Sequence, residues 1–254
     1  MGLSVYNNVE AMNAHRVLTN TNNSLSKSME RLSSGLRINR AADDAAGLAV
    51  SEGMRSQIRG MNVASRNAQD GISMVQVADG ALGSVGDMLQ RVRDLAVQAS
   101  NGTLTDAQRG NLDTEVQQLM TEIGKTGTDT EFNGLKIMAG SVATAGSAVT
   151  LQVGANASQS IAFTIGTVST SDLGISGIAV GTAASATAAI ASLDAAISTV
   201  TTSRANLGAI QNRLENTISR LGMTAENLQA AESRIRDADM AQEMIKFTKN
   251  QILH

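Results

Sequence analysis

Residues 193–235 read LDAAISTVTTSRANLGAIQNRLENTISRLGMTAENLQAAESRI and carry the clearest structural pattern of the chain. Every seventh residue in this stretch is apolar: Leu193, Val200, Leu207, Leu214, Leu221, Leu228 and Ile235. A period of seven keeps one side of an α-helix facing a partner helix, as in a coiled coil. We therefore predict one long helix here, with these residues packed against another helix.

A second stretch has the same period and supplies the predicted partner helix. Its residues at sevens are Met54, Met61, Ala68, Val75, Leu82, Leu89 and Ala96. The chain contains no Pro, although average usage would give roughly a dozen in this length. Because proline breaks helix interiors, its absence favours long uninterrupted helices. We predict a mainly α fold, a long antiparallel helical rod; a merely alanine-rich helical protein is the alternative.

A further helix is predicted near the N-terminus, over residues 3–33. Leu18, Leu25 and Leu32 form one apolar stripe along it, and Met29 lies beside that stripe. These four residues are the predicted packing positions of this helix.

The composition changes in the middle of the chain. Between Lys136 and Arg204 only two charged residues occur. Apolar residues alternate over 149–153 and again over 161–165, with turn-forming residues between them, which predicts a small β-hairpin. This stretch has too little apolar pattern for a large separate domain.

These patterns divide the chain into five segments. They are an N-terminal helical arm and connector (1–43), the N-terminal helical part of the rod (44–138), a small β-hairpin region (139–185), the C-terminal helix of the rod (186–236) and the start of a further helix (237–254).

The sequence offers no candidate catalytic, metal or cofactor site. The absence of Cys removes thiol catalysis and thiolate ligands. His15 and His254 have no partner at metal-ligand spacing, and the acidic pairs at 43–44 and 237–239 lack the ligands and glycine of a calcium loop. No phosphate-binding glycine motif occurs. We expect no enzyme activity and no cofactor.

Charge and hydropathy narrow the range of partners. The net charge is −3 with both signs interspersed, so we expect no nucleic-acid partner. No stretch approaches the ~20 apolar residues of a membrane span, and we expect no membrane insertion. The N-terminus lacks the basic start and apolar run of a cleaved signal peptide, so export would need another route.

Several longer motifs resemble bacterial flagellin. They are residues 30–39 (ERLSSGLRIN), 43–49 (DDAAGLA), 69–73 (QDGIS), 89–93 (LQRVR), 131–134 (EFNG), 207–214 (LGAIQNRL) and 231–237 (AESRIRD). The resemblance implies a structural subunit that polymerises into the extracellular flagellar filament for motility. It implies a short form without large outer domains, in which segments 1–43 and 237–254 build an inner layer.

The resemblance also implies partners. They are other copies of the chain, the flagellar type III export apparatus with its chaperone, and the cap and junction proteins. A further implied partner is Toll-like receptor 5 (TLR5), whose recognition site falls on Gln90, Arg91, Leu95 and Glu115. Leu18, Leu25, Met29 and Leu32 would contribute to inner-layer assembly.

Two alternatives stay open at this point. The end motifs are shared with hook–filament junction proteins. Flagellins also usually continue beyond the position of His254, so we expect a truncated C-terminus and incomplete pairing of the N-terminal helix. A non-polymerising fragment that binds a receptor or chaperone is therefore the second alternative.

Overall fold

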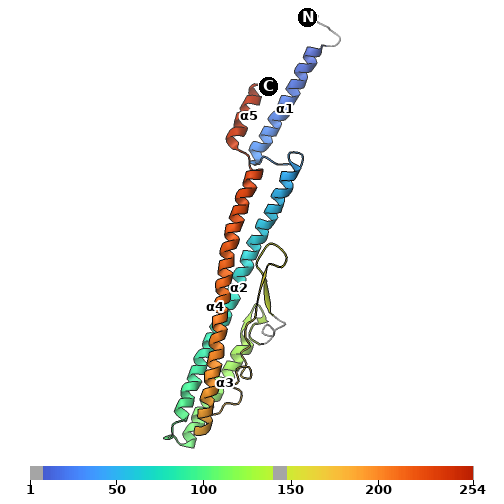
Figure 1. Ribbon diagram of the computed structural model, residues 1–254. Coiled ribbons are helices and arrows are strands. Elements are labelled where there is room, and N and C mark those ends of the chain that lie inside the picture. Colours follow the sequence, from blue (N-terminus) through green and yellow to red (C-terminus); the bar gives the residue numbers. More distant parts are fainter. Residues whose placement is uncertain (1–7, 140–147, 254) are drawn as a thin grey trace. The chain divides into compact units, whose positions relative to one another are not determined.

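The computed structural model describes residues 8–139 and 148–253 (Figure 1). Its elements in chain order are α1 (Val9–Ser34), α2 (Ala45–Ala99), α3 (Asp106–Asp129), β1 (Glu131–Phe132), β2 (Leu135–Lys136), β3 (Val149–Gln152), β4 (Ser160–Phe163), α4 (Ala183–Arg236) and α5 (Met240–Ile252). The mainly α fold with a small β-hairpin region is confirmed. The predicted start of the first helix at residue 3 lies outside the described residues.

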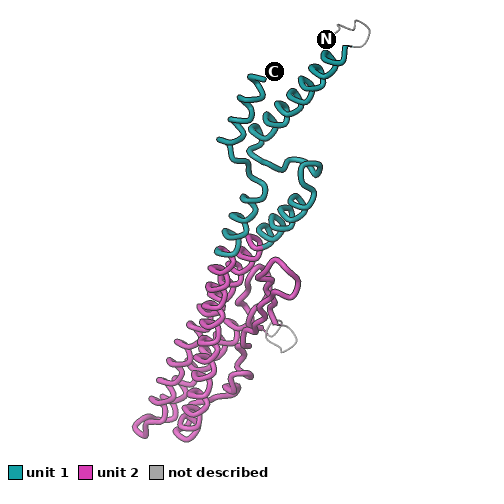
Figure 2. The backbone as a smooth tube through the Cα atoms, turned by 45° about the horizontal axis from the view of Figure 1, so that its top comes forward, with its two compact units in different colours: residues 1–60, 223–254 teal, residues 61–222 magenta. Residues whose placement is uncertain are grey.

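The chain forms two compact units (Figure 2). Unit 1 comprises residues 1–60 and 223–254, and unit 2 comprises residues 61–222. Our five-segment division follows helix ends and turns, whereas the compact units share α2 and α4. The assignment of the five segments to layers of a filament stays a prediction.

The core of unit 2 lies where α2, α3 and α4 pack together. Ion pairs join α2 to α4 at Asp79–Arg204 (2.8 Å) and at Arg93–Asp194 (2.7 Å). The residue number rises along α2 while that of the partner falls along α4, so these two helices run antiparallel. Since all four side chains are partly exposed, solvent screens both pairs, and they mainly fix the alignment of the helices.

The turn between α2 and α3 is held by a buried arginine. The Arg109 guanidinium donates to the carbonyl oxygens of Ala99 (2.9 Å), the last residue of α2, and of Asn101 (3.0 Å) in the turn that follows. It also pairs with Asp106 at 2.8 Å. Because every one of these contacts satisfies a donor, the buried charge is tolerated here.

An irregular segment covers the core after the hairpin. The strands β3 and β4 pair antiparallel, as the sequence predicts. Residues 164–182 then follow without regular secondary structure, apart from turns. This segment supplies fully buried side chains to the core, including Ile165, Ile175 and Val180.

The close approach of this segment to α3 requires a glycine. A Cβ added at Gly127 would overlap the backbone carbonyl oxygen of Val168, which cannot move aside as a flexible side chain could. We predict that Gly127→Ala lowers the free energy of unfolding by about 1–3 kcal/mol, measured by thermal or urea unfolding. The control is Gly124→Ala on the same helix, where the space is open. It should stabilise by up to about 1 kcal/mol through helix propensity, and equal effects of the two changes would refute this account.

One helix differs from our expectation about membranes. By length and composition alone, α4 is long and apolar enough to cross a bilayer. A single such helix is weak evidence for a span, because the core helix of a non-membrane protein passes the same test. The α4 residues Leu193, Leu207 and Leu214 belong to the buried core of unit 2.

Candidate interaction site

The terminal helices of unit 1 meet at a shared joint. α1 ends at Gly35, whose φ of 72° is the left-handed conformation that favours glycine at a helix C-terminus. The backbone N–H of Arg37 donates to the Arg236 carbonyl (2.7 Å), and that of Ala238 donates to the Gly35 carbonyl (2.9 Å). α1 ends where α5 begins, so the two helices lie antiparallel beside each other (Figure 1).

A cluster of polar side chains joins α1 to α5. Its members are Ser28, Arg31, Glu243 and Lys246, which we call the Glu243 cluster. The Ser28 hydroxyl donates to Glu243 Oε1 (3.0 Å), Lys246 Nζ donates to Glu243 Oε2 (3.2 Å), and Arg31 Nη1 lies 3.9 Å from Oε1. Among the described residues of α1 and α5, only Ser28 and Glu243 are buried.

The environment of Glu243 keeps its carboxylate ionised. Burial raises the pKa of Glu243, but the hydrogen bonds from Lys246 and Ser28 and the charges of Lys246 and Arg31 outweigh burial and lower the pKa overall. The sequence alone does not reveal this cluster, because Glu243 reads there as an ordinary surface residue of a short helix.

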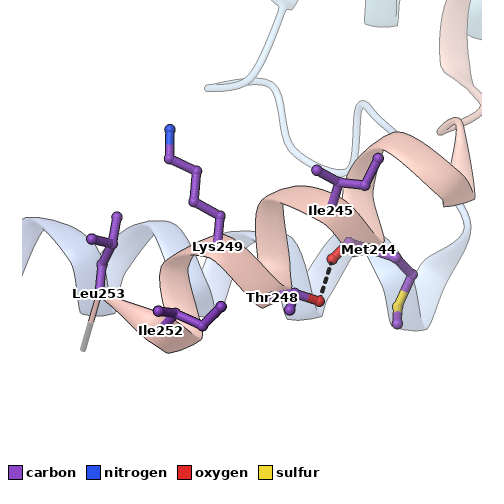
Figure 3. Close-up of a pocket in the computed structure, with 6 residues that line it drawn as sticks. All are labelled: Met244, Ile245, Thr248, Lys249, Ile252 and Leu253. Carbon is purple, nitrogen blue, oxygen red and sulfur yellow. Dashed lines mark hydrogen bonds between the residues drawn. The ribbon is translucent and has the colours of Figure 1, made fainter.

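The opposite side of α5 is apolar and uncovered. Its residues line an open groove of about 520 Å³, which we call the α5 groove: Met244, Ile245, Thr248, Lys249, Ile252 and Leu253 (Figure 3). Ile245 is 70% exposed and Ile252 is 79% exposed. Exposed apolar side chains gathered on one side of a helix make this groove a candidate interaction site.

α1 also carries uncovered apolar residues. Leu25 and Leu32 of the predicted stripe are half-buried, whereas Leu18 and Met29 are exposed. Within the described residues, α5 (13 residues, about 20 Å) lies beside only half of α1 (26 residues, about 39 Å). The exposed apolar residues of the uncovered half are Val9, Met12, Val17 and Leu18.

The connector between α1 and α2 is fixed by an acidic side chain. Asp43 Oδ1 lies 2.6 Å from Lys27 Nζ, and Oδ2 accepts from the backbone N–H groups of Asn39 and Arg40. The Lys27 hydrogen bond, followed by that of Arg40, lowers the pKa of Asp43 from 3.8 to about 2.

This shift predicts an acid-sensitive connector. A carboxylate whose folded pKa is depressed stabilises the folded state above its unfolded pKa, and loses that contribution as pH falls through the folded value. The Asp43 contribution should therefore disappear between pH 3.8 and about 2. We expect a carboxyl ¹³C NMR titration to give Asp43 a midpoint near 2, and Lys27→Ala to return it toward 3.8. An unchanged midpoint in Lys27→Ala would contradict the assignment.

The residues predicted as a receptor surface lie in unit 2. The Arg91 guanidinium donates through Nε (2.9 Å) and Nη2 (2.7 Å) to one oxygen of Glu115, so α2 and α3 are linked there. Gln90 and Arg91 are exposed and Glu115 is partly exposed. Leu95, predicted as part of this surface, is only 2% exposed and packs in the core, so its side chain is not accessible there.

The predicted helix-packing residues, which recur at every seventh position of two helices, differ in how deeply they are buried. The buried ones are Met61, Val75, Leu82, Leu89, Leu193, Val200, Leu207, Leu214 and Leu221. Met54, Leu228 and Ile235 are half-buried. These three lie in unit 1, whereas the buried ones lie in unit 2.

The described residues show no arrangement suited to catalysis on a metal. Within residues 8–139 and 148–253, no three His, Asp or Glu side chains are grouped so that they could hold an ion.

Comparison with known proteins identifies the family. The N-terminal helical region of bacterial flagellin matches residues 5–143, and the C-terminal helical region of bacterial flagellin matches residues 190–254. The chain belongs to the bacterial flagellin family. The resemblance seen in the sequence motifs is thereby confirmed.

Relatives of this flagellin match it over nearly all of the chain and most of their own length. The chain is 48% identical to the flagellar filament 33 kDa core protein of Treponema phagedenis and 49% identical to a flagellin of Halalkalibacterium halodurans. In both cases the match covers 98% of this chain and 91% of the relative. The crystal structure of Bacillus cereus flagellin matches with a TM-score of 0.55 and 32% identity, over 66% of this chain and 94% of that one.

Proposed function

We infer that the chain is a structural subunit that polymerises into a bacterial flagellar filament and so serves motility. The observation that carries this inference is the exposed apolar surface of α1 and α5 in a chain of the flagellin family. The relative from Treponema phagedenis is named as a filament core protein, which supports the same role.

The energetics of the terminal helices favour assembly. Covering an isoleucine fully contributes about 1.5–3 kcal/mol, and both Ile245 and Ile252 are largely uncovered in the single chain. A surface on one copy that binds a different surface on the next copy repeats without closing, which generates a filament. The α5 groove and the uncovered half of α1 are two such different surfaces.

Each of the five predicted segments can be assigned to a layer of the proposed filament. We propose that 1–43 and 237–254 form its inner layer, that 44–138 and 186–236 form the surrounding helical layer, and that 139–185 lies outermost. The short middle segment makes the filament thin and smooth. The family resemblance supports an extracellular location, type III export with a chaperone, and contact with cap and junction proteins.

The test is negative-stain electron microscopy of the purified chain at high concentration with a polymerising salt. We expect long, thin, unbranched filaments. Persistent monomer would contradict the proposal and favour the receptor- or chaperone-binding fragment. A hook–filament junction protein would instead be scarce in filaments sheared from the source cells, whereas a filament subunit would be their main component.

We further propose that unit 2 presents a recognition surface for TLR5. The exposed Arg91, held by Glu115 and adjacent to Gln90, supports this proposal, because a well-oriented arginine is a common hot spot of protein interfaces. Leu95 keeps α2 in place beneath it.

The receptor proposal makes a prediction about single arginines. Arg91→Ala should raise the concentration needed for half-maximal TLR5 signalling in reporter cells by about tenfold or more, because a central interface arginine is lost. Arg204→Ala is the control, since Arg204 is also partly exposed and ion-paired but lies on α4. Equal signalling by the two variants would rule out a recognition surface at Arg91.

A further inference from the structure

α5 packs against α1 through its more polar side, while its more apolar side faces away. Glu243 is 5% exposed, whereas Ile245 and Ile252 of the same helix are largely uncovered. Successive residues of an α-helix are about 100° apart, so both isoleucines lie on the opposite side of α5 from Glu243. A half-turn of α5 about its axis would bury the two isoleucines, uncover the partly buried Phe247 and release the carboxylate to water. Hydrophobic burial alone therefore favours the reverse orientation.

The residues covered where α5 meets α1 are also mostly polar on the α5 side. Those of α5 are Glu243, Phe247 and Asn250, and those of α1 include Thr21, Leu25, Ser28 and Leu32. Two of the three covered positions on α5 are thus polar. Something other than apolar contact must select this face.

The Glu243 cluster supplies that selection. The Glu243 carboxylate accepts from Ser28 and pairs with Arg31, and both of these residues belong to α1. A carboxylate on the outer face of α5 could reach neither of them. A slip of α5 by one turn along α1 would place Leu25 or Leu32 opposite Glu243, and neither leucine has a donor.

We propose that Glu243 is the positioning residue that determines which face α5 turns toward α1, and that it thereby keeps the α5 groove outward for a second copy of the chain. The second half of this statement rests on the proposed function. Buried polar contacts of this kind specify orientation and register, whereas replacing them with apolar residues often leaves stability equal or higher.

The test uses cysteine pairs in the full chain, which contains no Cys of its own. Thr21 lies one heptad before Ser28, and Asn250 lies one heptad after Glu243, so these two positions face each other in the observed orientation. Ile252 lies about 160° from Asn250 around α5. We compare intrachain disulfide formation in Thr21→Cys/Asn250→Cys with that in Thr21→Cys/Ile252→Cys. Since a disulfide needs closely placed Cβ atoms, the Asn250 pair should form faster by about tenfold.

Substitutions in the cluster should remove this preference. In a Glu243→Leu background we expect the ratio of the two rates to fall below about threefold, with helical content and thermal midpoint unchanged or higher. Ser28→Ala removes a donor without adding an apolar contact and should also lower the ratio. Glu226→Leu removes an exposed carboxylate of α4 and should leave the ratio at its original value.

Three results would overturn the proposal. They are a ratio near one in the unsubstituted cluster, a ratio unchanged by both Glu243→Leu and Ser28→Ala, and a ratio lowered equally by Glu226→Leu. If Glu243→Leu unfolds α5, cross-linking at both positions falls together and Ser28→Ala decides.

Assembly is measured separately. The cross-links are read in the soluble chain, so a failure to polymerise would contradict the proposed function without affecting the orientation result. Where filaments form, Glu243→Leu should raise the concentration at which they appear by about tenfold or more, because the groove is turned inward. Unchanged assembly together with a lost cross-link preference would show that the orientation has no part in filament growth.

Discussion

Replacing Ile245 and Ile252 together by glutamate is expected to abolish filament formation at concentrations where the unsubstituted chain polymerises. The two side chains supply about 3–6 kcal/mol when fully covered, and two carboxylates in their place would have to be desolvated without partners. Since each 1.4 kcal/mol changes an equilibrium tenfold, the critical concentration should rise by at least about 100-fold. The measurement is sedimentation of polymer over a concentration series.

The control for this variant is Leu135→Glu, which places the same charge on a similarly exposed apolar residue of unit 2. It should alter the critical concentration far less. Circular dichroism should show the same helical content and thermal midpoint for both variants, since neither change lies in the core of unit 2. Filament formation by the Ile245→Glu/Ile252→Glu chain at the normal concentration would show that the α5 groove is not an assembly surface.

A second large effect, on stability, is expected at the apolar residues that recur at every seventh position of α4. Leu193→Ala should lower the free energy of unfolding by about 2–5 kcal/mol, because Leu193 is completely buried in unit 2 and its loss leaves a cavity. For a unit of this size the thermal midpoint should fall by about 5–15 °C, measured by calorimetry. Leu135→Ala, at an exposed leucine, is the matched control and should change the midpoint little. Equal shifts of the thermal midpoint in the two variants would mean that these regularly spaced apolar residues do not form the core.

The helical part of the fold could be predicted because its signal is local and repetitive. Val75, Leu82 and Leu89 on α2 recur at the same spacing as Leu193, Leu207 and Leu214 on α4, and a sustained period of seven is typical of helices packed along one side. The antiparallel pairing of the helices follows from the turns between them. The alternation around residues 149–163 predicts the hairpin for the same reason.

The parts that could not be predicted depend on contacts between residues far apart in the chain. Residues 166–182 bury Ile175 and Val180 without any period, since an irregular segment takes its shape from the helices beneath it. Glu243 reads as a surface carboxylate until Ser28, 215 positions away, is placed opposite it. The family resemblance places Leu95 at a receptor surface, and only packing against the rest of unit 2 shows it to be buried.

In the proposed filament, copies of this flagellin assemble through the apolar faces of their terminal helices. We would examine this by a helical reconstruction, by electron cryomicroscopy, of the polymer formed by the full chain. We predict that Ile245 and Ile252 are buried against a neighbouring copy in the inner layer, with residues 139–185 on the outside. A polymer in which these two isoleucines remain exposed to solvent, or whose copies touch only through unit 2, would contradict the account.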